Sequence, residues 1–134
     1  MIQTKETFNE TLNKFLNEAN RHPRLTEQEE IELLAKKSKK TEDSKECIEK
    51  VVKANMRNIV SVARLYQDSG LTATVVIHTC ILCLYEAADR YEPSMGCRFL
   101  TLAYGYMHGR IRVAIRIKRK RLVDRIISCI EECD

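Results

Sequence analysis

The sequence predicts an all-α protein, a compact bundle of about five helices, and three observations support this fold class. The chain has 134 residues, a length that suits one domain with a modest core. It contains only four Gly and two Pro, so turn-forming residues are too scarce for a many-stranded β-fold. Apolar residues recur three or four positions apart in most segments, which is the spacing of one helix face.

The first two helices are predicted on either side of Pro23, which interrupts the helical pattern. Thr26 and Glu29 form a capping-box pattern that begins the second helix, and Lys36 to Lys40 stand at its C-terminal end, where the helix dipole favours cations. The apolar face of the first helix is predicted to carry Phe8, Leu12, Phe15, Leu16 and Ala19.

Three longer helices are predicted to follow. One runs from about residue 41 or 43 to residue 68 and is stopped by Ser69-Gly70. The next, about 72–90, is apolar on almost every side and is therefore expected to be buried or to lie in an interface. The turn at 91–96 precedes a fifth helix, from about Phe99 past Arg121, and residues 126–134 are expected to add one amphipathic turn or to fray.

Positive charge is concentrated in the last third of the chain. The net charge is +4, yet residues 96–134 carry nine basic and four acidic side chains, and 96–123 carry no acid at all. On a helix, His108, Arg112, Arg116 and Arg119 lie within about 80° of one another. Such a cationic stripe favours a polyanion, most commonly nucleic acid, and the simpler alternative is a solvated basic helix end that favours its own dipole.

Several function classes find little support. The histidines lie on separate segments without a nucleophile or carboxylate partner, so we predict no enzyme and no cofactor. His78, Cys80 and Cys83 resemble half of a zinc site, but small apolar filling explains both cysteines better, and no metal is predicted. No secretory signal or bilayer-spanning stretch is visible, so we expect a cytoplasmic protein with reduced thiols and no membrane contact.

Three stretches in order carry a resemblance to a known family: Leu25–Leu33, Val52–Ala63 and Ala88–Phe99. Together they resemble the bacterial sigma-70 family of RNA polymerase initiation factors, over nearly the whole chain. The resemblance implies a segment like sigma region 1.2 at residues 1–40, a domain like sigma region 2 at 41–123 and a short tail at 124–134. It also implies core RNA polymerase and partly single-stranded promoter DNA as partners.

The resemblance assigns nucleic-acid contacts residue by residue. Leu25, Thr26 and Glu30 match the segment that touches the downstream part of the unpaired strand. Tyr106 matches one of two aromatics that wedge the duplex open, and Arg112 falls where the family reads the upstream edge of the −10 element. Asn55 and Arg57 match family residues near the −10 nucleotides, and Arg98, Phe99 and Thr101 match part of the pocket for a flipped adenine. The stripe residues His108, Arg116 and Arg119 complete the candidate contacts to −10 DNA.

The chain differs from the family at positions that contact DNA or polymerase in the family. The second wedge aromatic and a base-reading glutamine are replaced by Gly105 and Gly109, and two pocket aromatics are replaced by Cys97 and Leu102. Base stacking on an aromatic ring contributes roughly 1–3 kcal/mol, so autonomous promoter reading should be weakened. In the family the 72–90 helix docks on a coiled coil of the polymerase clamp, where an acid, an amide and a second acid are replaced here by Val75, His78 and Thr79. The candidate docking residues are these three and Leu82.

Two functions follow from these residues. In the first, the protein is an atypical sigma-like initiation factor that binds core polymerase and −10 DNA. In the second, it is a degenerate sigma-like adaptor or regulator that binds a further protein partner and has lost autonomous promoter recognition. The basic helix favours the first, and the altered docking and wedge residues favour the second.

Overall fold

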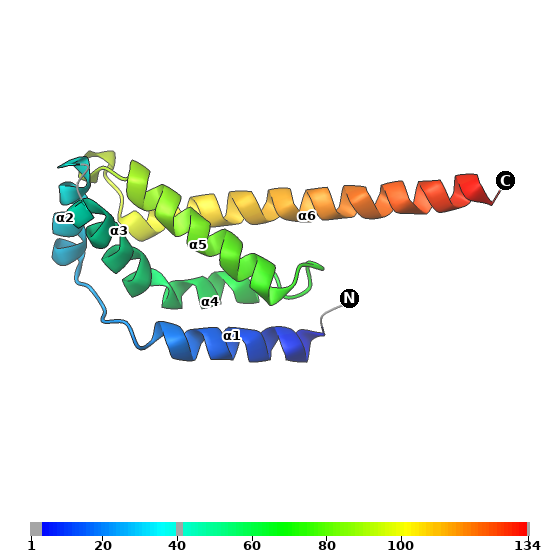
Figure 1. Ribbon diagram of the computed structural model, residues 1–134, viewed down its shortest axis with the longest axis horizontal. Helices are drawn as coiled ribbons and strands as arrows, with labels where there is room; N and C mark the ends of the chain where they lie inside the picture. Colours follow the sequence, from blue (N-terminus) through cyan, green and yellow to red (C-terminus); the bar gives the residue numbers. More distant parts are fainter. Residues whose placement is uncertain (1–3, 40–41, 134) are drawn as a thin grey trace.

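The computed structural model describes residues 4–39 and 42–133, and within them the fold is all-α, as predicted. Figure 1 shows α1 beside α4, α5 crossing the bundle obliquely, and a long α6 that leaves the bundle at its C-terminal half. No helix in the described ranges is both long and apolar enough to cross a membrane. The helices are α1 (Lys5–Ala19), α2 (Glu27–Ala35), α3 (Glu42–Asn55), α4 (Arg57–Arg64), α5 (Ala73–Arg90) and α6 (Phe99–Glu132), with short 3-10 turns η1 (Lys36–Lys39) and η2 (Pro93–Met95).

The start of each of the first two helices has a clear local cause. Thr4 caps α1, and Thr26 caps α2 by accepting a hydrogen bond from the backbone N–H of Glu29, so the predicted start of the second helix is confirmed. Phe8 and Leu12 are buried between α1 and its neighbours α4 and α5. Lys37, just after α2, donates to the carbonyl oxygens of Ala88 and Tyr91 and so ties α2 to the end of α5.

The prediction of one helix from about 41 to 68 is wrong in two respects, because the structure has two helices there and the second ends at Arg64. The break is at Met56. Its backbone N–H bonds to the carbonyl oxygen of Lys53, three residues back, whereas a regular α-helix would use the carbonyl of Val52, four residues back. Met56 keeps helical dihedral angles, φ −59° and ψ −35°, so the apolar stripe continues across the break. Val52, Ile59 and Ala63 are accordingly buried, and the helix count rises to six in the described ranges.

The centre of the core is the contact between α5 and α6. One face of α5 is fully buried, and α6 presents Phe99, Ala103, Met107 and Ile111, four residues apart, against it. The connection between the two helices turns at Gly96, whose φ of +74° is a backbone conformation that suits glycine. This contact sets the orientation of the outer face of α6.

The tail differs from the prediction. Residues 124–132 neither fray nor form a single turn, because α6 continues without a break to Glu132 and residues 119–133 are exposed. The domain boundary expected at 123/124 falls inside this helix, and the boundary expected at 40/41 lies outside the described residues. We call residues 119–132 the α6 extension.

Candidate nucleic-acid and partner interface

The predicted cationic stripe lies on the solvent side of α6. Arg112, Arg116 and Arg119 are exposed and form no ion pair with any described residue. His108, at the start of the stripe, is half-buried, and its Nδ1 lies 2.5 Å from the hydroxyl oxygen of Tyr66 at the end of α4. The stripe therefore begins at the α4–α6 contact and runs toward the α6 extension, with its arginines free to meet an anion.

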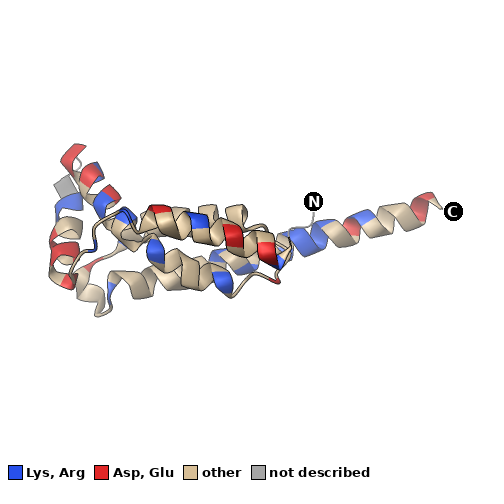
Figure 2. Ribbon diagram, turned by 90° about the horizontal axis from the view of Figure 1, so that it is seen from below, with Lys and Arg blue, Asp and Glu red and all other residues tan. Residues whose placement is uncertain are grey.

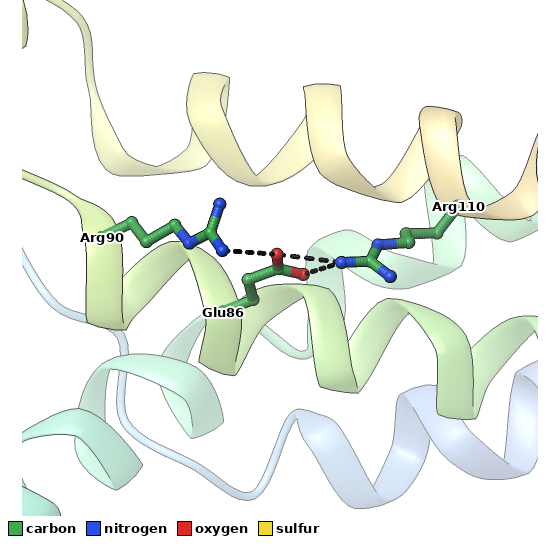
Figure 3. A network of polar contacts seen from close by, with 3 residues as sticks. All are labelled: Glu86, Arg90 and Arg110. Carbon is green, nitrogen blue, oxygen red and sulfur yellow. Dashed lines mark hydrogen bonds and ion pairs between the residues drawn. The ribbon is translucent and has the colours of Figure 1, made fainter.

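Other basic residues of α6 are engaged by the bundle. Arg110 donates to both carboxylate oxygens of Glu86 on α5, at 2.8 and 2.9 Å, and Arg90 approaches the same carboxylate at 3.7 Å (Figure 3). Lys118 donates to the carbonyl oxygen of Gly70. These two cations lie outside the stripe and are held by the bundle, whereas the stripe arginines have no such partner.

A pocket of about 240 Å³ brings together three predicted site residues, Asn55, Arg57 and Arg98. They come from the end of α3, the start of α4 and the residue before α6, so only the folded bundle makes them neighbours. Its floor and walls include Leu25 and Glu30, both from the segment that the resemblance linked to the downstream strand. The remaining lining residues are Arg24, Ala54, Asn58 and Leu100.

The polar groups of this pocket are only partly satisfied. The Asn55 amide is buried and donates to Glu30 Oε2 at 3.2 Å and to the carbonyl oxygen of Val51 at 2.8 Å. Burial raises the pKa of the Glu30 carboxyl, although the Asn55 hydrogen bond opposes the shift. Arg57 donates through Nη2 to the carbonyl oxygen of His22, but its buried Nε has no partner in the described part of the chain. A buried, unpaired donor is a free-energy cost, and Arg57, which carries it, also lines the pocket.

The structure limits what two of the predicted contact residues can offer a nucleic acid. Phe99 is completely buried and packs edge-on against the ring of Tyr91, with ring centroids 6.0 Å apart, so no face of it is open to a base. Asn55 has both amide hydrogens directed within the protein, so its side chain shapes the pocket by holding Glu30. In both cases the physical reason is burial in the core.

Along α6 the remaining predicted residues vary in exposure. Thr101 is exposed, Tyr106 is half-buried, and Arg98 reaches Glu27 at 3.9 Å while staying largely exposed. Gly105, where the resemblance expects the second wedge aromatic, has open space around the position of a Cβ atom, and so has Gly109. Packing therefore does not require glycine at either position, and a larger side chain would fit.

The predicted partner residues lie on the outer side of α5. Val75 and Leu82 are 44% and 70% exposed, His78 is exposed, and Thr79 is half-buried with its hydroxyl donating to the carbonyl oxygen of Val75. A shallow groove of about 290 Å³ joins Thr79 and Leu82 to residues of α6. The α6 side contributes Val113 and Ile117, which sequence reasoning missed because their apolar side chains were not followed as a separate face.

Cys80 and Cys83 are core residues. Burial raises their thiol pKa values to about 12 and about 11, so both thiols are protonated at neutral pH and poorly suited to bind a metal. His78 lies on the exposed side of the same helix, away from them. These positions support the interpretation as small apolar filling.

Comparison with known proteins matches residues 51–121, just over half of the chain, to the sigma-70 region 2 family. The chain belongs to the sigma-70 family. The matched residues run from the second half of α3 through the packed half of α6 and the cationic stripe, so this sigma region 2 contains the pocket residues Asn55 and Arg57, the stripe and the α5–α6 groove.

Curated relatives agree with this family and are much longer. The chain is 34% identical over 67 residues to a chloroplastic RNA polymerase sigma factor, sigF, of Arabidopsis thaliana, covering 50% of this chain and 12% of that protein. It is 39% identical over 67 residues to an RNA polymerase sigma-C factor of Nostoc sp., covering 50% and 16%. An RNA polymerase sigma-C factor of Myxococcus xanthus is 28% identical over 117 residues, covering 85% of this chain and 38% of that protein.

Proposed function

We propose that this chain is a sigma-type transcription initiation protein that binds core RNA polymerase and contacts the −10 region of promoter DNA. The observation that carries the proposal is the unpaired cationic stripe of Arg112, Arg116 and Arg119 on the solvent side of α6. The same helix begins at the pocket that Arg57 lines. Membership of the sigma-70 region 2 family supports the same partners.

The stripe is proposed to bind the phosphate backbone. Phosphate contacts by exposed Arg side chains release counterions and supply affinity without reading sequence. Because the bundle holds the packed half of α6 in place, Arg112 and Arg116 meet the backbone without first being ordered. Arg98 and Thr101, exposed at the start of the same helix, extend the contact toward the pocket.

The pocket is proposed to receive one unpaired base of the opened strand. Its lining offers Arg57 and the Glu30 carboxyl as polar groups, with Leu25 and Leu100 supplying apolar surface. A flipped base is held by hydrogen bonds to its edge together with contacts to its faces. At the wedge position Tyr106 supplies the ring that stacks on a base, since Gly105 carries no ring.

The outer face of α5 is proposed to bind core RNA polymerase. Val75 and Leu82 expose apolar surface that continues into the groove lined by Val113 and Ile117. A contiguous apolar surface of this kind marks a protein contact. The same surface supports the second candidate function, an adaptor that binds a protein partner without reading a promoter, because its residues differ from the acidic and amide side chains expected of the family.

A two-step binding experiment tests the proposal. The purified chain is mixed with core RNA polymerase and analysed by gel filtration, and the complex is then offered forked DNA with an unpaired −10 strand. We expect co-elution and capture of the fork. Arg57→Ala should weaken capture of the fork, Leu82→Glu should weaken co-elution with polymerase, and Lys45→Ala, at an exposed α3 cation, should change neither. Co-elution without capture of DNA would favour the adaptor, and the absence of both would refute the initiation factor.

A further inference from the structure

The α6 extension carries an apolar face that nothing in the described structure covers. Leu122, Val123, Ile126, Ile127 and Ile130 are 47–62% exposed, and every residue from 119 to 133 is exposed. At about 100° per residue, these side chains with Cys129 and Cys133 span an arc of about 160°, and Arg119 lies within that arc at its bundle end. The rest of the helix carries the other polar residues, namely Lys120, Arg121, Asp124, Arg125, Ser128, Glu131 and Glu132. A helix with this division between faces buries its apolar side against a partner.

Charge along the α6 extension is divided between its two ends. Lys118, Arg119, Lys120 and Arg121 stand where α6 leaves the bundle, whereas Glu131 and Glu132 stand at its far end. Figure 2 shows the basic residues gathered at the bundle end of this segment and an acidic residue near the C-terminus. The α6 extension therefore has opposite charges about three turns apart.

We propose that the α6 extension pairs with the same segment of a second copy of this chain, in antiparallel orientation. In that arrangement the basic residues 118–121 of one copy lie opposite Glu131 and Glu132 of the other, at both ends of the contact, and the two apolar faces cover each other. A parallel pair would place the basic ends side by side and repel. The segment is thus complementary to itself in one orientation only.

The geometry allows this contact without disturbing the bundle. The α6 extension is about 20 Å long at 1.5 Å per residue, and it projects away from α1 to α5 (Figure 1). The last tie between α6 and the bundle is the hydrogen bond from Lys118 to Gly70, just before the extension begins. The first turn of the extension still borders the bundle, because Leu122 and Arg125 line one pocket with Leu71 and Val75. Leu82, on the proposed polymerase surface, lies outside that pocket.

The test is the oligomeric state of the full chain, measured by sedimentation equilibrium under reducing conditions because Cys129 and Cys133 are exposed. We expect a reversible dimer at micromolar concentration. Ile126→Glu with Ile130→Glu should weaken dimerisation by at least about tenfold, since two charges would have to be buried. Ser128→Glu, on the opposite side of the extension, is the matched control and should leave the dimer intact.

Orientation is tested by charge exchange. Glu131→Lys should weaken the dimer, and adding Lys120→Glu, which lies on the same edge of the apolar face, should restore it. A chain that stays monomeric at all concentrations would overturn the proposal, as would a dimer that is indifferent to Ile126→Glu with Ile130→Glu. A dimer that the first charge exchange leaves unchanged would overturn the antiparallel arrangement. Circular dichroism of each variant separates these outcomes from loss of the fold.

Discussion

The two halves of α6 belong to one unbroken helix but have opposite environments. From Phe99 to Lys118 the helix is fixed by the bundle, with Phe99, Met107 and Ile111 completely buried. From Arg119 to Glu132 every residue is exposed. The comparison shows that helical continuity does not make a segment part of a domain, because tertiary packing, and not the backbone hydrogen bonds alone, holds side chains in place.

The largest difference between the halves should appear in stability. Phe99→Ala removes a fully buried ring and should lower the free energy of unfolding by about 3–5 kcal/mol, whereas Ile130→Ala should change it by less than about 0.5 kcal/mol. Urea denaturation at low protein concentration measures both. Equal effects of the two substitutions would mean that the α6 extension packs against the bundle.

On the outer face of the packed half of α6, position 105 should accept the aromatic side chain that the family resemblance expects there. Gly105→Trp places a ring in open space next to the wedge residue Tyr106, and base stacking on it should strengthen binding to forked −10 DNA by about 1–3 kcal/mol. Fluorescence anisotropy with core polymerase present measures the gain. Gly105→Leu is the control, because it raises helix propensity without a ring; an equal gain from Leu would exclude stacking as the cause.

The arginines of the two halves should differ in their contribution to nucleic-acid binding. Arg112→Ala with Arg116→Ala should reduce the slope of log affinity against log salt by about 1.4–1.8, the value for two lost phosphate contacts. Arg121→Ala with Arg125→Ala removes the same charge from the side of the α6 extension that faces away from the stripe. It should reduce the slope much less. The slopes come from titrations between low and moderate salt, and equal losses would mean that binding responds to net charge alone.

The smallest expected effect concerns Glu30 beneath the pocket. Burial raises the pKa of this carboxyl in the folded chain above its unfolded value near 4.5, so the folded state binds the proton more tightly. Stability should therefore fall as pH rises from 4.5 through the folded pKa and change no further from this group above it. Glu30→Gln keeps an oxygen for Asn55 and should flatten that decline in thermal unfolding curves; an unchanged pH profile would contradict the assigned shift.

Much of the fold could be predicted because local rules and the bundle agree. Apolar spacing identified the buried positions Phe8, Leu12, Val52 and Ile59, and the capping pattern located the start of α2 at Thr26. The break at Met56 could not be predicted, because Met56 keeps helical dihedral angles and the apolar period runs through it. The full length of α6 was missed because no neighbouring element marks its end.

The candidate site divides in the same way. The sequence by itself determined the family, the cationic stripe of Arg112, Arg116 and Arg119 and the apolar character of Val75 and Leu82, since residue identity and helical period are local properties. Only the tertiary structure decided that Phe99 belongs to the core, that Asn55 holds Glu30, and that Arg57 keeps a buried donor without a partner. The physical reason is that burial depends on what packs against a residue, and those neighbours come from segments far apart in the chain.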